Sequence, residues 1–186
     1  MTDRVIETER LKLRPFCTDD LDIIEKLYCD EEILRYTPFD VMSHEQAAAH
    51  LRRIVRDWEQ VPLQSLEFAV LLKATGEKIG RCHILVDPET DTGMVGGFLL
   101  KKHWGQRLGE EFFGAMIRYS FDGLHLHRVN AVCNPKNVAS WKALEHFGMR
   151  REALFRQKCR YIKHGAVSWE DELEYARLAS EMNNNK

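Results

Sequence analysis

Residues 94–110 limit the possible folds of this chain more than any other segment. An apolar stretch from Met94 to Leu100 contains the adjacent glycines Gly96 and Gly97, and a glycine-bearing turn follows it directly. Two glycines inside a strand weaken it unless they mark a bulge or a close approach of another backbone. The segment therefore predicts a strand with an edge that a ligand can approach, followed by the start of a helix.

This strand is the third of a predicted meander. Phe68–Leu72 and Ile79–Val86 are apolar runs joined by the turn residues 74–77, and a second turn at residues 87–93 leads to the glycine-bearing strand. Such runs between Gly, Pro and Asp clusters are typical of antiparallel strands.

The remaining segments mix the periods of helices and strands, which predicts an α+β fold. Strands are expected at residues 9–16, 128–133, 152–161 and 168–178, and helices after a Thr18 cap, from Ser43 to about Gln60, at 105–120 and at 136–147. Residues 170–176 also have helix propensity, so the last strand has an alternative. We expect one domain over residues 1–180 and a polar, disordered tail over residues 181–186.

Composition excludes several classes of function. The 186 residues include 27 Lys and Arg against 29 Asp and Glu, so no positive field draws the protein to nucleic acid or to an anionic membrane. The five cysteines are scattered without a C-x-x-C pair, which predicts free thiols and no metal site. The N-terminal segment has acidic residues where a signal peptide would have its apolar run, and no later segment reaches the roughly 18 apolar residues of a membrane span, so we expect a cytoplasmic protein.

The turn at Lys101–Glu110 is a candidate anion site. Unpaired amides at the start of a helix and the positive end of its dipole favour phosphate. Neither a Walker A loop nor a G-x-G-x-x-G fingerprint occurs here. A plain strand-to-helix turn is the alternative for this segment taken alone.

The segment Arg128–Met149 resembles the C-terminal half of the GNAT superfamily of acetyl-coenzyme A dependent N-acetyltransferases, in the branch that contains the ribosomal-protein N-terminal acetyltransferases. The resemblance extends over nearly the whole chain, because Glu9–Pro15, Gly76–Gly80 and Trp104–Gln106 fall in the family's order and spacing. It implies a twisted, mostly antiparallel sheet split by a bulge, with helices on both faces.

The resemblance implies that the pyrophosphate of coenzyme A binds the turn formed by Trp104, Gly105, Gln106, Arg107, Leu108 and Gly109. Two positions depart from the family's R/Q-x-x-G-x-G/A pattern, since Trp104 replaces the leading Arg or Gln and Arg107 replaces the middle glycine. A helical first turn still presents its amides with Arg107 in place, and the guanidinium itself can pair with phosphate. The alternative is that Arg107 only points to solvent.

The resemblance further implies that the main chain of Phe98, Leu99 and Leu100 meets the pantetheine arm. Asn137 matches the family's coenzyme-contacting asparagine, although it can equally cap its own helix. Phe98 and Leu100 are also candidate core residues.

Catalytic residues are less well marked. Leu144 occupies the position of the tyrosine that protonates the leaving thiolate in many members, and Ser140 matches the serine assigned to this task in the ribosomal-protein branch. Glu67 and His83 are candidate bases for the amine, directly or through water. For each of these residues a structural role is the alternative.

These features predict an N-acetyltransferase that uses acetyl-coenzyme A and no metal. A protein N-terminal α-amine is the favoured acceptor, and the branch resemblance alone supports that choice. The alternatives are a small amine such as an antibiotic, polyamine or amino acid, or an inactive sensor that binds coenzyme A. Residues 21–35, residues 43–60 and the final hairpin would set the acceptor, and the protein would be a monomer or a homodimer.

Overall fold

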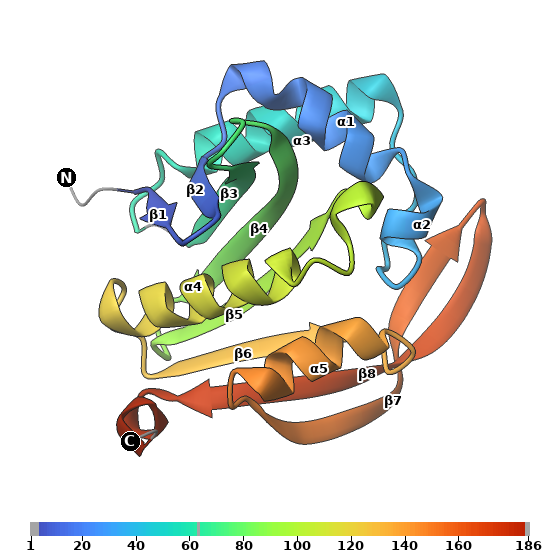
Figure 1. The fold of residues 1–186 in the computed structure, drawn as a ribbon. Helices are drawn as coiled ribbons and strands as arrows, with labels where there is room; N and C mark the ends of the chain where they lie inside the picture. The colour runs from blue at the N-terminus through green and yellow to red at the C-terminus, as the bar shows by residue number, and fades with distance from the viewer. Residues whose placement is uncertain (1–3, 63, 185–186) are drawn as a thin grey trace.

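The computed structural model describes residues 4–62 and 64–184, and within them eight strands form one twisted sheet (Figure 1). The order of the strands is β1-β2-β3-β4-β5-β6-β8-β7, and every neighbouring pair is antiparallel except β5 and β6. The strands are β1 (Ile6–Glu7), β2 (Leu11–Pro15), β3 (Ser65–Leu72), β4 (Lys78–Asp87), β5 (Thr92–Leu99), β6 (Arg128–Cys133), β7 (Arg150–Lys163) and β8 (Ala166–Leu178).

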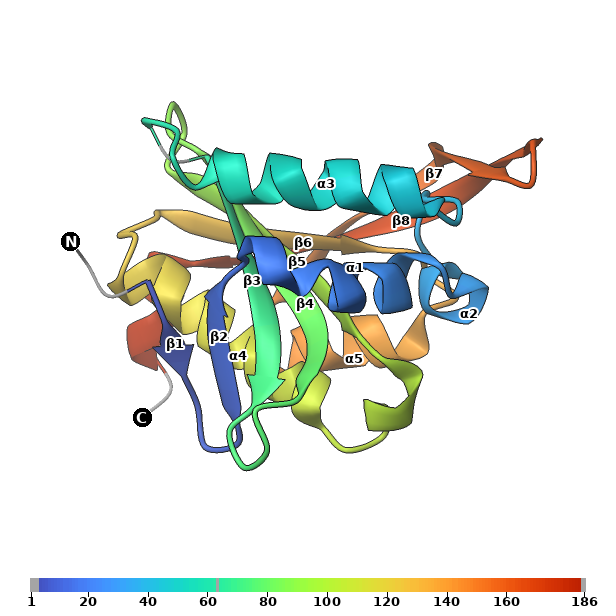
Figure 2. The same ribbon diagram turned by 90° about the horizontal axis from the view of Figure 1, so that it is seen from above.

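Helices cover both faces of this sheet, as expected (Figures 1 and 2). The helices are α1 (Leu21–Tyr28), α2 (Glu31–Leu34), α3 (His44–Asp57), α4 (Leu108–Asp122) and α5 (Val138–His146), with short 3-10 segments η1 (Thr18–Asp20), η2 (Lys101–His103) and η3 (Ala179–Asn184). Alternate residues of β3 face opposite sides. Phe68 packs in the core beneath α4, whereas Ala69 packs with α1 and α3.

The sheet opens between β5 and β6. These strands pair in parallel at only three positions, from Thr92 with Arg128 to Met94 with Asn130. β4 and β5 remain paired through Gly96 and Gly97 without a register shift. The β6-facing edge of β5 therefore has no strand partner among the described residues after Met94.

The two glycines of β5 allow close packing. A β-carbon on Gly97 would lie 2.6 Å from the Arg81 carbonyl oxygen, and one on Gly96 would lie 2.5 Å from Cε1 of His83. Of the two explanations that the sequence suggested, close approach accounts for the pair.

Side-chain caps begin three of the α-helices, α2, α3 and α5. Ser43 begins α3 in a capping box with Gln46, as predicted, and Asp30 caps the short α2. Thr18 was predicted as a cap, but it lies inside η1 and α1 begins after Asp20. The Asp20 carboxylate binds Arg14 at 2.7 Å and the Cys17 amide at 2.9 Å.

The C-terminal hairpin confirms the predicted strands and excludes the helical alternative for residues 170–176. Leu173 and Tyr175 of β8 are buried in the core, and pairing with β6 and β7 overrides the local propensity. The expected disordered tail does not begin at residue 181, because η3 reaches residue 184 and Glu181 accepts from the Leu178 amide at 3.0 Å. Residues 185–186 lie outside the described residues.

Candidate functional site

The turn before α4 has the geometry of an anion-binding helix start. Gly105 takes a left-handed backbone with φ of 73°. The first backbone bond of α4 runs from the Glu111 amide to the Arg107 carbonyl at 3.1 Å. The three amides before it have no acceptor within the helix and carry the positive end of its dipole; they belong to Leu108, Gly109 and Glu110.

The outer side of this turn is open. A β-carbon on Gly105 or Gly109 would meet no atom within 4 Å. The side chains of Trp104, Gln106 and Arg107 are exposed, whereas Leu108 is buried. Leu108 therefore contributes only its amide to the surface of the turn.

Arg107 is not in the first helical turn, which corrects one expectation. It is the N-cap of α4 and takes a left-handed backbone with φ of 59°. Glycine adopts this conformation without strain, which gives a physical reason for the glycine of the related pattern. The exposed guanidinium forms an ion pair with Glu110 at 2.8 Å.

Arg10, just before β2, links the turn and the first turn of α4 to the N-terminal strands by hydrogen bonds. Its guanidinium donates to the Gln106 carbonyl at 3.1 Å and to the Glu111 carboxylate at 2.6 Å. Thr8 also donates to Glu111, at 2.5 Å. Burial alone would raise the pKa of Glu111, but the hydrogen bonds from Thr8 and Arg10 lower it. The sequence did not single out this support, because its residues are about a hundred positions apart.

The unpaired edge of β5 presents main-chain groups to the opening. The Leu100 amide donates to the Ile79 carbonyl at 2.8 Å, and antiparallel strands exchange bonds at alternate residues. The amides and carbonyls of Val95, Gly97 and Leu99 therefore face away from β4.

Around this edge, the side chains are already engaged. The Trp104 indole donates to the Leu99 carbonyl at 2.9 Å, which fixes Trp104 beside the strand end. Phe98 packs edge-on to Tyr28 with ring centroids 5.4 Å apart, and its main-chain groups face β4. Leu100 packs against the same core as Phe98. Because Trp104 occupies the Leu99 carbonyl, the predicted segment 98–100 presents one free main-chain group, the Leu99 amide, and Gly97 and Val95 extend the edge.

Asn137 and Ser140 lie at the start of α5, directly after β6. The Asn137 side chain accepts from the Ser140 amide at 3.3 Å, so Asn137 caps this helix. Its carbonyl oxygen is used in this bond, and its amide NH2 group has no protein partner among the described residues.

The Ser140 side chain lies close enough to the Cys133 thiol, at the end of β6, to affect its pKa. Burial raises the pKa of Cys133 to about 11, partly offset by Ser140, so the thiol is protonated at neutral pH. Leu144, one turn further along α5, is 1% exposed and belongs to the core. The position of the missing tyrosine is therefore closed by apolar packing.

Glu67 and His83 are cross-strand partners on β3 and β4, so the structure brings the two candidate bases together. Arg81 lies between them. Its guanidinium binds the Glu67 carboxylate at 2.6 Å and His83 Nδ1 at 3.0 Å. Burial, assisted by the positive charge of Arg81, lowers the pKa of His83 to about 3. Ser140 lies on α5, which follows β6, whereas Glu67 and His83 lie on strands on the other side of β5.

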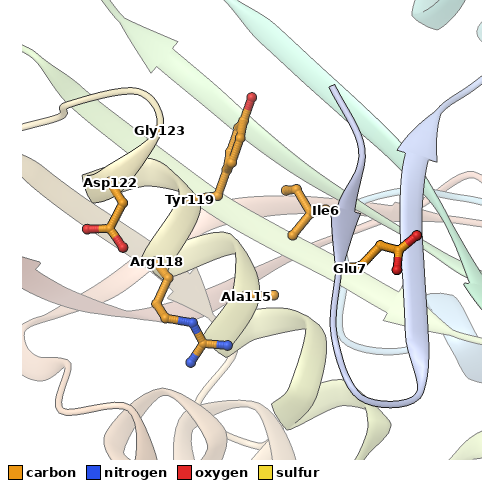
Figure 3. Close-up of a pocket in the computed structure, with 7 residues that line it drawn as sticks. All are labelled: Ile6, Glu7, Ala115, Arg118, Tyr119, Asp122 and Gly123. Atoms are coloured by element: carbon orange, nitrogen blue, oxygen red, sulfur yellow. The ribbon is translucent and has the colours of Figure 1, made fainter. Parts of the chain in front are cut away.

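Two hollows lie away from these residues. One, shown in Figure 3, lies between β1 and the C-terminal part of α4, where Ile6, Arg118 and Tyr119 line it. The other lies at the start of β5, beside Met94 and Asn130. Neither is lined by a residue of the turn before α4.

Within residues 4–62 and 64–184, no three or more His, Cys, Asp or Glu side chains are grouped so that they could hold a metal. In the same part of the chain no helix is long and apolar enough to cross a membrane.

Comparisons with known proteins agree with this geometry. A profile of the acetyltransferase (GNAT) domain matches residues 10–150. An uncharacterized N-acetyltransferase, p20 of Bacillus licheniformis, is 31% identical over 153 residues, which cover 80% of this chain and 84% of that protein.

Solved structures share the fold. A GNAT-family acetyltransferase from Bacillus anthracis superposes with a TM-score of 0.81 at 25% identity, covering 95% of this chain and 99% of the other. RimL, a ribosomal L7/L12 alpha-N-protein acetyltransferase in complex with coenzyme A, superposes with a TM-score of 0.80 at 16% identity, covering 94% and 97%.

Proposed function

The chain belongs to the GNAT superfamily of acetyltransferases, and from this premise we propose that it transfers an acetyl group from acetyl-coenzyme A to a protein N-terminal α-amine. The observation that carries the proposal is the open helix start at Leu108–Glu110 beside the unpaired edge of β5. One supplies amides for an anion, and the other supplies amides and carbonyls for an extended chain.

The residues present fit coenzyme A. Amides of residues 104–110 would hold the pyrophosphate, and the open space beside Gly105 and Gly109 lets it approach. The amide and carbonyl of Gly97 and the amide of Leu99 would bind the pantetheine amides as a strand partner does. The free amide group of Asn137 would add a further donor from the β6 side.

If the acceptor is an α-amine, the reaction needs little help from a general base to remove its proton. Its pKa of about 7.7 to 8.0 leaves a useful neutral fraction near neutral pH, whereas a lysine near 10.4 does not. We infer that the amine attacks directly in a ternary complex. Ser140 would donate a hydrogen bond to the departing sulfur, because it matches the serine that the ribosomal-protein branch uses for this task and Leu144 replaces the tyrosine of other members.

The choice of a protein N-terminus rests on the resemblance to the ribosomal-protein branch. RimL, which shares the fold, is named for that reaction. We place the catalytic unit within residues 1–180. The five cysteines are all unpaired in the structure, which supports action in the reducing cytoplasm.

Release of free thiol from acetyl-coenzyme A tests the proposal. The purified chain is assayed with peptide N-termini, polyamines and aminoglycosides, while calorimetry measures binding of coenzyme A. Release with peptides alone supports it, and release with small amines alone replaces the acceptor. Binding without release across the panel favours the sensor alternative.

Ser140→Ala sharpens this assay. We expect kcat to fall by about tenfold to a hundredfold, since general acid catalysis contributes about 10² to 10⁴ and a serine is a weak donor. The affinity for coenzyme A should stay within about threefold. Val138→Ala is the matched control, because Val138 is an exposed residue of the same helix.

A further inference from the structure

A network of polar side chains lies on the α1 and α3 side of the sheet. We call it the arginine cluster: Tyr28, His50, Arg53, Glu67, Arg81 and His83. Tyr28, Glu67 and Arg81 are buried, His50 and His83 are partly buried, and Arg53 is exposed. Arg81 is at its centre and is 5% exposed. It donates to the Tyr28 hydroxyl at 2.5 Å, as well as to Glu67 and to His83. The coenzyme contacts described above do not use this cluster.

The contact between Arg81 and His83 fixes the position of a proton. A guanidinium only donates hydrogen bonds, so Nδ1 of His83, 3.0 Å away, must accept. A neutral imidazole that accepts at Nδ1 carries its proton at Nε2. His83 is thus a hydrogen-bond donor at Nε2.

His50 also has an arginine at Nδ1, but its Nε2 has a protein partner. Its Nδ1 lies 3.2 Å from the Arg53 guanidinium, and its Nε2 lies 3.1 Å from the Tyr28 hydroxyl. The Nε2 proton of His50 is therefore used within the cluster. The Nε2 of His83 has no protein partner among residues 4–62 and 64–184.

The free donor lies over β5, next to the opening of the sheet. The His83 ring lies over Gly96, since a β-carbon there would be 2.8 Å from Nε2. Gly96 precedes Gly97, whose main-chain groups line the unpaired edge of β5. The glycine thus makes room for the ring beside the proposed path of the pantetheine arm.

We propose that Arg81 acts as a positioning residue that holds His83 in its Nε2-protonated tautomer, so that His83 donates a hydrogen bond to a substrate carbonyl oxygen in the reaction site. This rests on the proposed function, which supplies that oxygen from the transferred acetyl group or from the acceptor. This donor role replaces the role of a base for the amine. The Nδ1 lone pair of His83 accepts from Arg81, and the Glu67 carboxylate is held in an ion pair with Arg81, so neither is free to take a proton.

The tautomer is tested without substrate. Long-range proton–nitrogen NMR correlation of the 15N-labelled full chain at pH 7 reports which ring nitrogen carries the proton, and His83→Gln identifies the signals of His83. We expect the proton on Nε2, with His50 as an internal reference. In Arg81→Met/Glu67→Gln, which leaves no buried charge unpaired, the preference should be lost. A proton on Nδ1 or a charged ring in the native chain would overturn the proposal.

Activity tests the role itself. His83→Gln keeps an N–H donor near the Nε2 position but cannot act as a base, whereas His83→Leu removes both functions. We expect His83→Gln to remain within about tenfold of the native kcat. His83→Leu should lose about 10² to 10³, the cost of one carbonyl-polarising donor. Equal loss in both variants would contradict the donor role, and His127→Gln, at an exposed residue, controls for the exchange.

Steady-state kinetics distinguish the two carbonyl oxygens, of the acetyl group or of the acceptor, to which His83 could donate. Donation to the acetyl carbonyl lowers kcat alone in His83→Leu, and donation to the acceptor raises the KM of the acceptor. If the native chain acetylates no amine, the proposed function fails, while the NMR result still decides the tautomer.

Discussion

The two sides of β5 present different chemical groups. On the β6 side, the proposed coenzyme site consists of main-chain amides and carbonyls at Val95–Leu99 and at the start of α4. On the α1 side, the arginine cluster consists of side chains from two helices and two strands. The first site is open, and its ion pairs of Arg107 with Glu110 and of Arg10 with Glu111 are at the surface. The centre of the second is buried, where Arg81 pairs with Glu67. A main-chain site tolerates substitutions that keep the backbone path, whereas each member of the cluster depends on the others.

The largest difference should appear in stability when a charge of the cluster is removed. Arg81→Met leaves the Glu67 carboxylate buried, with Arg53 only 3.7 Å away as a partial partner. We expect a loss of about 3 to 5 kcal/mol in the free energy of unfolding in urea. Adding Glu67→Gln should restore more than half of it. Equal instability of the single and double variants would show that packing, not charge, holds the cluster.

The histidines of the cluster predict a pH effect. Burial and the neighbouring arginines lower the pKa of His50 to about 4 and of His83 to about 3, against about 6.5 in the unfolded chain. Between pH 6.5 and 4 the unfolded state therefore binds more protons, so stability falls as the pH falls. The slope approaches about 1.4 kcal/mol per pH unit for each histidine.

Denaturant unfolding across this range checks that slope. His83→Gln should remove about half of it, while His127→Gln, at an exposed residue, should leave it nearly unchanged. A flat profile in the native chain would mean that the cluster does not hold its histidines neutral.

A substitution of Trp104 tests the proposed coenzyme site on the β6 side of β5. Trp104→Phe removes the hydrogen bond to the Leu99 carbonyl and keeps an aromatic ring at a half-exposed position. We expect a loss of about 1 kcal/mol in unfolding free energy, the net value of one such bond. Affinity for coenzyme A should fall with it, because the turn is less firmly attached to β5. Unchanged values in both measurements would show that the indole does not position the turn.

Arg107→Gly should have the smallest effect. It relieves a left-handed non-glycine residue, but glycine gains entropy in the unfolded chain, so the unfolding free energy should change by less than about 1 kcal/mol. We expect calorimetry to give an affinity for coenzyme A within about threefold of the native value. A tenfold loss, about 1.4 kcal/mol, would show that the guanidinium pairs with phosphate.

The same contrast explains what the sequence could predict. The coenzyme turn is local, so the glycines and the change from strand to helix period are visible within residues 94–110. The mixed fold, the meander and the final strands followed from apolar periodicity in the same way. For the two glycines of β5 the sequence left a bulge and a close approach as alternatives, and the structure shows the close approach.

The arginine cluster was not predictable, because Tyr28, His50, Glu67 and Arg81 meet only after folding. Glu67 and His83 were noticed singly, but their shared partner Arg81 was not. Two helix starts that differ from the prediction have similar causes. Arg14 of β2 binds the Asp20 carboxylate just before α1, and the left-handed backbone of Arg107 makes α4 begin at Leu108. Each depends on a contact or a backbone angle that residue type alone does not specify.

Amide hydrogen exchange of the full chain, with and without coenzyme A, tests the central claim most directly. The account predicts slower exchange on binding at residues 95–99 and 105–110, with no change around the hollow of Figure 3 at residues 118–123. Protection at residues 118–123 and none at the β5 edge or the turn would contradict it.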